Sequence, residues 1–448
     1  MKKAKANPAR RLVMPASAVS RRRFLEAAGA AGGAAAFLVA KTKFLRAQAA
    51  GEPLKIGCKG PFTGPASRTG DEFKSGVAMA LEDARAEGDL PLVIDGEERE
   101  VEIVYIDSQS SPEKAVRAVT DAITREGVQF IANGWHSSVA MALIDAEAPY
   151  KIVHLGHLGE SQYISEKINQ DPEKYRGWFK GWPAPPVFAG LYGPPLKHFI
   201  EAGLWQPANM KAAVLVEDTD FGRGWGDAAI ESLGSAGFEL LPYDVTSLEE
   251  TEFSPLLTKY KAQDVSLVAM TSTGNVSVSN FVKQFRQQDV KALMIAHGLG
   301  WFSEWYELTG DASNYAVAID SPHVINDAQA QWVERYKAKF GTDPGIGASG
   351  ITYDYMRMAL KVLNKAGTLD FDTLVETVYD NPYRGVWNYY QFAREPGPNA
   401  LAPGEVMTGD FMEGFFFPMV QFMDGEAHVI WPLEYAKAEF QAPPWLKA

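Results

Sequence analysis

The stretch Phe130-Ile131-Ala132-Asn133-Gly134-Trp135-His136-Ser137-Ser138 decides the fold of this chain. A short apolar run ends in Asn-Gly, and a helical pattern begins at Val139. This order predicts a buried strand, a tight loop and a helix N-terminus. The free N–H groups of a helix N-terminus favour an anion in front of them. In open parallel sheets, ligands bind at loops of this kind, outside the carboxyl ends of the strands.

Strand and helix patterns alternate on both sides of this loop. Before it we expect strands at 54–58 and 101–106, each followed by a helix, and after it a helix at 139–148 and a strand at 152–155. The alternation returns later, with strands expected at 212–216, 239–243, 266–270 and 292–296 and helices ending near Ser235, Ala262 and Gln288. The spacing predicts βαβ units. The fold class is therefore α/β, with two doubly wound Rossmann-like lobes.

Three stretches are expected to connect the lobes: the Pro- and Trp-rich residues 171–195, residues 318–322 and residues 384–386. Helices expected at 328–340 and 353–366 suit the first lobe, and Asp424-Gly425 is expected to turn a C-terminal hairpin. The predicted division is a signal peptide at 1–49, a first lobe of 50–182 and 322–384, and a second lobe of 183–321 and 385–448.

The N-terminus has the order of an export signal. Ser20-Arg21-Arg22-Arg23-Phe24-Leu25 resembles the bacterial twin-arginine motif, an apolar run follows, and Ala47-Gln48-Ala49 has the pattern of a cleavage site. No later stretch is long and apolar enough to cross a bilayer. We therefore expect a mature periplasmic protein, starting near Ala50, without direct membrane insertion.

Charge and cysteine content exclude several classes of partner and site. The chain of 448 residues has 43 Lys/Arg and 56 Asp/Glu, and the first 49 residues hold 11 of these basic residues but only one acid. So acidic a mature surface excludes nucleic acid and anionic membranes as partners. The single cysteine, Cys58, excludes an intrachain disulfide and a Cys-based metal site, and it is interpreted as a core residue.

Several short motifs follow one another along the chain: Gly60-Pro61-Phe62-Thr63-Gly64-Pro65, Asp107-Ser108-Gln109-Ser110-Ser111-Pro112, Gly134 with Ser137-Ser138, Asp218 with Phe221-Gly222-Arg223-Gly224, Phe253-Ser254, and Asp424-Gly425. Taken in this order, they resemble the branched-chain amino acid-binding (Leu/Ile/Val-binding-like) group of periplasmic solute-binding proteins. The resemblance covers essentially the mature chain. It implies two lobes with three hinge crossings that close on a solute, and a monomer that serves an inner-membrane ABC permease without a cofactor or catalysis.

The resemblance also implies which residues bind the solute. The loop from Asn133 to Ser138 is expected to hold a carboxylate, residues 157–159 to add backbone groups, and Phe221 to act as an aromatic lid. The full predicted set is Thr69, Trp135, His136, Ser137, Ser138, His157, Leu158, Gly159, Phe221, Thr273, His297 and Trp301.

One position departs from the family pattern and affects the choice of solute. Amino acid-binding relatives place a Glu against the ligand ammonium, where this chain has His297. An imidazole does not replace a carboxylate against a cation. With the added Trp and His residues, this favours a small carboxylate or amide-type solute, aromatic or otherwise unlike a standard amino acid.

Other interpretations of the same residues remain open. Ser137 and Ser138 could only cap a helix, and Trp135 and Phe221 could only pack in a core. His154 lies within an apolar run and is interpreted as a core histidine. His136, His157 and His297 could share a metal, but no H-x-x-x-H spacing or carboxylate cluster supports one, so no metal is predicted.

Alternative functions also remain open. The chain could bind a branched-chain or hydrophobic amino acid, or act as a soluble ligand sensor on the same fold. A sensor usually has a transmembrane helix or an output domain, and the sequence shows neither. An exported enzyme is disfavoured because no G-x-S-x-G, H-E-x-x-H or P-loop motif is present.

Overall fold

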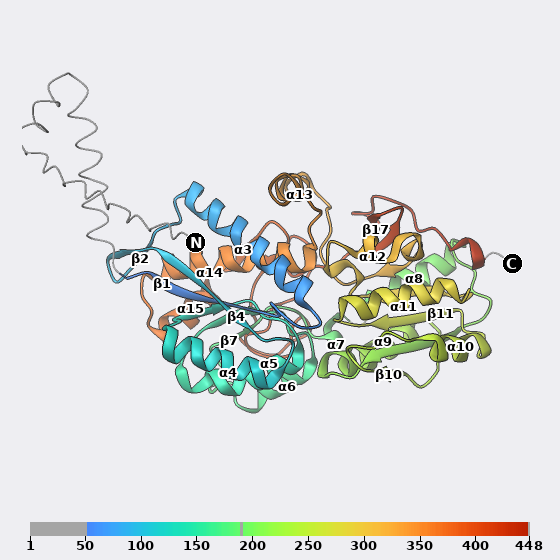
Figure 1. The fold of residues 1–448 in the computed structure, drawn as a ribbon, viewed down its shortest axis with the longest axis horizontal. Helices are drawn as coiled ribbons and strands as arrows, with labels where there is room; N and C mark the ends of the chain where they lie inside the picture. Colours follow the sequence, from blue (N-terminus) through green and yellow to red (C-terminus); the bar gives the residue numbers. More distant parts are fainter. Residues whose placement is uncertain (1–51, 189–190, 447–448) are drawn as a thin grey trace, which may run out of the picture. The chain divides into compact units, whose positions relative to one another are not determined.

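The structure is a computed structural model that describes residues 52–188 and 191–446. The predicted export signal at 1–49 lies outside the described residues. Most strands of the described range belong to two separate sheets, with helices between successive strands (Figure 1). This arrangement agrees with the predicted α/β class.

The first sheet is parallel and contains the strand that precedes the Asn133–His136 loop. Its order is β4-β1-β5-β6-β7. The strands are β1 (Leu54–Gly60), β4 (Val101–Asp107), β5 (Phe130–Ala132), β6 (His154–His157) and β7 (Trp178–Lys180). The helices of this unit are α3 (Ser67–Glu87), α4 (Pro112–Asp121), α5 (Ser137–Glu147), α6 (Gln162–Gln170), α14 (Ile346–Ala366) and α15 (Phe371–Asp380), and β2 (Leu92–Ile94) and β3 (Glu97–Arg99) form a small hairpin.

Helices cover both faces of this sheet. Successive strand residues point to opposite faces, so Phe130 packs in the core that includes Phe73 of α3 and Leu360 of α14, whereas Ile131 packs with Leu143 of α5. Helix α3 lies along α14 (Figure 1). A parallel sheet buried on both faces holds its strand ends rigidly, and this positions the loops that follow them.

The second sheet has the order β10-β8-β11-β12-β13-β16-β17, with β9 beside β8. Its strands are β8 (Lys211–Glu217), β9 (Glu239–Leu240), β10 (Asp244–Thr246), β11 (Leu267–Thr271), β12 (Leu293–His297), β13 (Val317–Ala318), β16 (Met419–Met423) and β17 (Glu426–Trp431). The helices that follow in this part of the chain are α7 (Pro185–Phe188), α8 (Gly193–Glu201), α9 (Asp220–Ser235), α10 (Ser254–Ala262), α11 (Asn275–Gln287), α12 (Trp305–Thr309) and α13 (Asp327–Phe340). All pairings are parallel except those of β13 with β16 and β16 with β17.

Several sequence predictions are confirmed in detail. Helix α10 has the predicted limits, and Asp424 and Gly425 turn the C-terminal hairpin with φ values of 51° and 87°. Positive φ at both central residues is the backbone requirement of a two-residue hairpin turn. The short hairpin of β14 (Tyr383–Arg384) and β15 (Tyr389–Tyr390) overlaps the predicted third crossing, which itself stays a prediction.

Two of the differences from the prediction concern the first sheet and the helices that cover it. Trp178–Lys180 was assigned to a crossover, but it is strand β7 of the first sheet. Helix α14 begins at Ile346 rather than near Tyr353. Its first turns are rich in small residues because α3 approaches closely, and a Cβ added at Gly76 would lie 2.3 Å from the Ser349 carbonyl oxygen. Glycine weakens a helix pattern in the sequence while permitting this contact.

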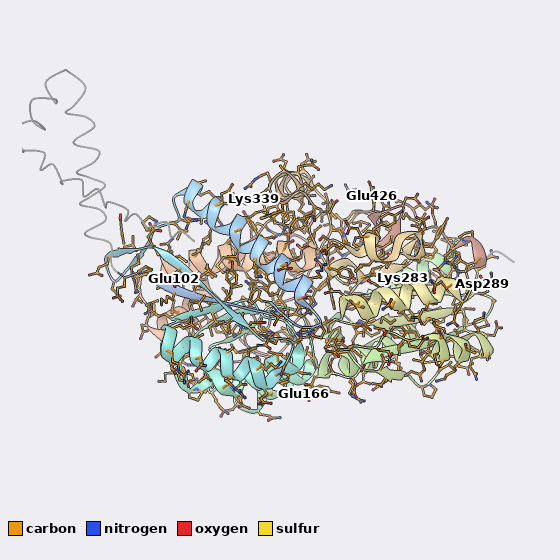
Figure 2. The ribbon with its side chains drawn as sticks, viewed as in Figure 1. Glu102, Glu166, Lys283, Asp289, Lys339 and Glu426 are labelled. Carbon is orange, nitrogen blue, oxygen red and sulfur yellow. The ribbon has the colours of Figure 1, made fainter. Side chains whose placement is uncertain are left out.

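The predicted lobe limits stay a prediction. The chain after α12 returns to the first sheet, since α14 packs on α3. Beyond the third crossing, Tyr390 donates to Asp354 of α14 at 2.8 Å, and Phe392 meets Phe179 of β7 with ring centroids 5.1 Å apart. Charged side chains such as Glu102, Glu166, Asp289, Lys339 and Glu426 are exposed at the periphery (Figure 2).

Candidate functional site

A cavity lies where loops of the two lobes meet. Its free volume is only about 10 Å³, about the space of one water molecule, because the surrounding side chains nearly fill it. Its lining residues are Trp135, His136, Ser137, Leu158, Glu160, Trp182, Phe221, Thr273 and Trp301. A solute of several atoms therefore fits only when these side chains or the lobes move apart.

The loop between β5 and α5 has a strained backbone. Asn133 and His136 both have a φ of 64°, and His136 combines it with a ψ of 125°, a region that glycine normally occupies. His136 is the N-cap residue of α5, and no side chain caps this helix N-terminus. The loop therefore presents free helix N–H groups beside the cavity, as the sequence predicted.

The two serines of this loop have separate roles. The Ser137 Oγ accepts hydrogen bonds from the backbone N–H groups of Glu160 and Ser161, each at 3.0 Å. Because both acceptor positions of the oxygen are used, its hydrogen is free to be donated into the cavity. The Ser138 Oγ instead accepts from the Asp220 N–H of α9 at 3.3 Å, which joins the two lobes.

Lys59 supports this loop from below. It is fully buried on β1, and its Nζ donates to the Trp135 carbonyl at 2.9 Å and lies 3.4 Å from His157 Nε2. The Gly159 N–H donates to His157 Nδ1 at 2.9 Å, so a neutral imidazole carries its hydrogen on Nε2. Lys59 Nζ can accept a hydrogen bond from His157 Nε2–H only when Lys59 is a neutral amine. Burial lowers the pKa of Lys59 to about 7, which makes the amine form accessible.

His154 anchors the start of the loop. One ring nitrogen is 2.8 Å from Glu147 Oε2 and the other is 2.7 Å from the Asn133 carbonyl oxygen. The interpretation of His154 as a core histidine is confirmed, because both nitrogens have buried partners. His157 stacks on Trp178 at 5.0 Å and likewise lies beneath the loop.

Aromatic rings form most of the cavity wall. Trp135 of the first lobe meets Trp301 of the second edge to face, with centroids 5.2 Å apart. Phe221, at the start of α9, lies 5.9 Å from Trp301. The Trp301 Nε1 donates to the Asp320 carbonyl at 2.5 Å, whereas the Trp135 Nε1 is buried without a partner. These rings offer flat apolar surfaces and one unused donor.

Trp182 completes the wall from the connection between the lobes. Its ring packs against Phe415 and Phe417, with centroids 5.4 Å and 5.1 Å apart. The preceding Lys180 Nζ donates to the Trp182 carbonyl, and it forms a fully buried ion pair with Glu405 at 3.1 Å. The position of this ring therefore depends on a buried charge pair.

Glu160 places a carboxyl group in the cavity. It is 3 % exposed, and its Oε1 has no hydrogen-bond partner. Burial raises the pKa of Glu160 well above its usual range, and the nearby Asp320 and Glu217 raise it further against the opposing charge of Lys180. Burial therefore favours the protonated form of Glu160.

Glu217, at the end of β8, is buried but satisfied. It accepts from the Thr273 backbone N–H at 2.5 Å, from the Thr273 hydroxyl at 2.8 Å and from the Thr219 hydroxyl at 2.7 Å. These bonds hold the loops after β8 and β11 together. Thr273 thus reaches the cavity edge with its backbone N–H and hydroxyl hydrogen already donated.

The structure brings together seven of the twelve predicted residues in the cavity wall. These are Trp135, His136, Ser137, Leu158, Phe221, Thr273 and Trp301. The other five predicted residues are absent from the lining: Thr69, Ser138, His157, Gly159 and His297. Thr69 is buried with an unpartnered hydroxyl, Gly159 packs on Ile164, and His297 lies behind the wall, 5.1 Å from the ring centroid of Trp301.

Sequence reasoning missed two lining residues, Glu160 and Trp182. Glu160 directly follows the predicted residues 157–159, so extending that loop by one residue would have included it. Trp182 was hidden in the Pro-rich stretch assigned to a crossover. The expectation that the cleft offers no carboxylate to a cation is therefore incomplete, because Glu160 supplies a carboxyl group from a different loop.

Comparison with known proteins identifies the family. The family profile described as periplasmic binding protein matches residues 53–402. The chain belongs to this family. It is a periplasmic binding protein with the type I fold, and not an enzyme.

Individual relatives of this periplasmic binding protein are distant. A leucine-, isoleucine-, valine-, threonine- and alanine-binding protein of Pseudomonas aeruginosa is 23 % identical over 336 residues, which cover 75 % of this chain and 84 % of the relative. A solved structure from Silicibacter pomeroyi has a TM-score of 0.71 at 21 % identity and covers 88 % of this chain and 100 % of that one. A solute-binding protein of Rhodopseudomonas palustris BisB5, in complex with 3,4-dihydroxybenzoic acid, has a TM-score of 0.69 at 19 % identity, with 88 % and 99 % covered.

Two further properties of the binding protein bear on its ligands and location. Within residues 52–188 and 191–446, no three His, Cys, Asp or Glu side chains are grouped so that they could hold a metal ion. Over the same residues, no helix has the length and apolar character needed to cross a bilayer.

Replacing Lys59 by Met is expected to flatten the pH dependence of stability. Between the folded-state pKa of about 7 and the unfolded pKa near 10.4, the unfolded chain binds one more proton, so the stability of the wild type rises with pH. Met removes this contribution, which is on the order of 2 kcal/mol between about pH 7 and about pH 9. Urea unfolding at both pH values measures it.

The matched control is Lys55→Met, on the same strand but with a side chain that is 33 % exposed. This variant should retain the pH dependence of the wild type. Parallel curves for wild type and Lys59→Met would show that Lys59 stays charged in the folded protein.

Proposed function

We propose that this protein binds a small carboxylate or amide-type solute with an aromatic or otherwise flat body, and delivers it as a monomer to an inner-membrane ABC permease. The solute lies in the cavity between the lobes and is enclosed by hinge closure. The N-terminal segment directs export by the twin-arginine route, with cleavage near Ala49.

The observation that carries this proposal is the uncapped N-terminus of α5, which opens into an aromatic cavity. The Ser137 hydroxyl hydrogen and the free helix N–H groups supply donors for an anionic or carbonyl oxygen. The rings of Trp135, Trp301 and Phe221 supply the apolar surfaces for a flat body. Donors at one end and rings around the rest match an aromatic carboxylate.

Contacts across the cavity support enclosure of the solute. The Ser138 Oγ accepts from Asp220, and Arg68 of α3 forms an ion pair with Glu304 at 3.0 Å. Only the first of these is shielded, because the Arg68 side chain is 60 % exposed, and an exposed ion pair contributes little. Because these direct contacts between the lobes are weak, binding of the solute determines the population of the closed state.

The solved neighbour from Rhodopseudomonas palustris, in complex with 3,4-dihydroxybenzoic acid, gives independent support for an aromatic acid. The Pseudomonas aeruginosa relative favours a second candidate, a hydrophobic amino acid. One observation in this chain also favours that candidate, because an ionised Glu160 could face the ammonium of an amino acid. The aromatic wall argues for the first candidate, and so does the burial of Glu160, which raises its pKa and disfavours the ionised form.

A thermal-shift panel with benzoate, benzamide, cyclohexanecarboxylate, L-phenylalanine and L-leucine tests the proposal. A ligand of the native state raises stability by about 2.7 kcal/mol at roughly 100 times its dissociation constant. Benzoate is expected to raise the unfolding temperature most, with benzamide next and cyclohexanecarboxylate weaker because it is not flat. A shift by L-leucine without a shift by benzoate would replace the first candidate by the second.

A further inference from the structure

Two buried polar atoms lie close together at one side of the cavity, with Glu160 in its wall and His297 just behind it. Glu160 Oε1 and His297 Nε2 both lack a hydrogen-bond partner, although the two residues are only 3 % and 1 % exposed. Their closest approach, from His297 Nε2 to Glu160 Oε2, is 4.0 Å, which is too long for a hydrogen bond. Unpartnered buried polar groups are unfavourable, so a group that bonds to both is expected there when a solute is bound.

The hydrogen-bond network behind His297 assigns its tautomer. The Tyr192 hydroxyl lies 2.7 Å from His297 Nδ1 and 3.4 Å from both the N–H and the carbonyl oxygen of Ile319. Donation along the shorter contact, to Nδ1 rather than to the carbonyl oxygen, leaves the imidazole hydrogen on Nε2. Burial lowers the pKa of His297 to about 3, so the ring is neutral. His297 thus offers a donor towards Glu160.

Glu160 offers the complementary acceptor. A carboxyl oxygen accepts a hydrogen bond whether the group is ionised or neutral. The pair therefore presents a donor on His297 and an acceptor on Glu160, whose carboxyl group comes within 4.0 Å of His297 Nε2. An ammonium would leave the His297 Nε2–H unpaired, because it cannot accept a hydrogen bond. A hydroxyl both accepts and donates, and it satisfies the two atoms together.

From this geometry we infer that Glu160 and His297 select a solute with a hydroxyl group, which accepts from His297 Nε2–H and donates to Glu160 Oε1. The inference rests on the proposed function, in which the carboxylate of the solute lies at the N-terminus of α5. The solute class is then a hydroxy-substituted aromatic carboxylate. Tyr192 is a positioning residue, because it acts on the solute only through the tautomer of His297.

Isothermal titration calorimetry with matched probes tests the inference. The probes are benzoate, 3- and 4-hydroxybenzoate, and 3- and 4-fluorobenzoate, which resemble the hydroxy compounds in size but cannot donate. The wild-type protein is expected to bind one hydroxybenzoate isomer roughly ten- to hundred-fold more tightly than benzoate and its fluoro analogue. Equal affinities for the three would overturn the inference.

Variants assign the preference to named atoms. Glu160→Met is expected to abolish the preference for the hydroxy compound, while Glu160→Gln, which keeps an acceptor oxygen, should retain most of it. His297→Phe keeps a ring in the same packing but removes the donor, and it should reduce the preference as well. Ser137→Ala is the comparison, because it should weaken benzoate and hydroxybenzoate by the same factor. Thermal unfolding of each variant without ligand verifies that it is folded.

The outcomes separate this inference from the proposed function. If benzoate binds but hydroxylation has no effect, or if Glu160→Met leaves the preference unchanged, the inference is wrong and the proposed function stands. If none of the five aromatic acids binds to the folded protein, both are wrong.

Discussion

The Trp135→Ala/Ser137→Ala double variant is expected to bind the tightest carboxylate of the thermal-shift panel about 2–4 kcal/mol more weakly than the wild type. The Ser137 hydrogen is free for the solute because two backbone N–H groups occupy its oxygen. A hydrogen bond to a charged oxygen is stronger than a neutral one. Removal of the Trp135 ring also opens the wall opposite Trp301.

Calorimetry of the double variant, of both single variants and of Ser137→Thr measures this effect. Ser137→Thr keeps the hydroxyl and should retain most of the affinity. Tyr150→Ala, which removes a 39 % exposed ring that does not line the cavity, is the control and should bind as the wild type does. Unchanged affinity of a folded double variant would refute the assignment of the solute to this cavity.

Replacing Lys180 by Met is expected to lower the free energy of unfolding by about 3–5 kcal/mol. Lys180 and Glu405 are both fully buried and form an ion pair at 3.1 Å. Removal of one partner leaves a buried carboxylate without a counter-charge. Glu405 also accepts hydrogen bonds from the Ala184 N–H and the Ser165 hydroxyl. Loss of the Lys180 charge therefore also disturbs the segment around Trp182, which lies between Lys180 and Ala184.

A double-mutant cycle separates the charge effect from loss of packing. The Lys180→Met/Glu405→Gln variant should regain a large part of the stability, because no unpaired charge remains. Lys259→Met, which breaks an exposed pair with Asp244, should have a much smaller effect. If the cycle shows no coupling between positions 180 and 405, the ion pair does not stabilise the connection.

The fold could be predicted from local patterns because each α/β unit repeats the same signal. Apolar runs of strand length, each followed by an amphipathic helix, can form only a parallel sheet covered by helices. The prediction failed at Trp178–Lys180, where a three-residue strand precedes a run of prolines. So short a strand has no periodicity of its own, and its pairing with β6 and with Glu405 makes it a strand.

The candidate site could be predicted in part. Residues that follow strands, such as Trp135, Ser137 and Thr273, are expected at the edge formed by the carboxyl ends of a parallel sheet. This expectation does not require knowledge of how the two sheets are arranged. His157 was expected beside the solute but lies under the loop, because a bulge between Leu155 and His157 turns its ring onto Trp178. Side-chain direction at a bulge depends on neighbours that are distant in the sequence.

The stretch from Phe130 to Ser138 by itself determined a strand, a loop and a helix N-terminus fit for an anion, because backbone geometry follows from local residue types. Only the tertiary structure placed Glu160 in the same cavity and His297 within 4.0 Å of it. These two residues are 137 positions apart, with Glu160 on a loop of the first lobe and His297 at the end of β12 in the second. Burial determines whether Glu160 is charged, and the contact with Tyr192 determines the tautomer of His297. No local sequence pattern encodes the burial or this contact.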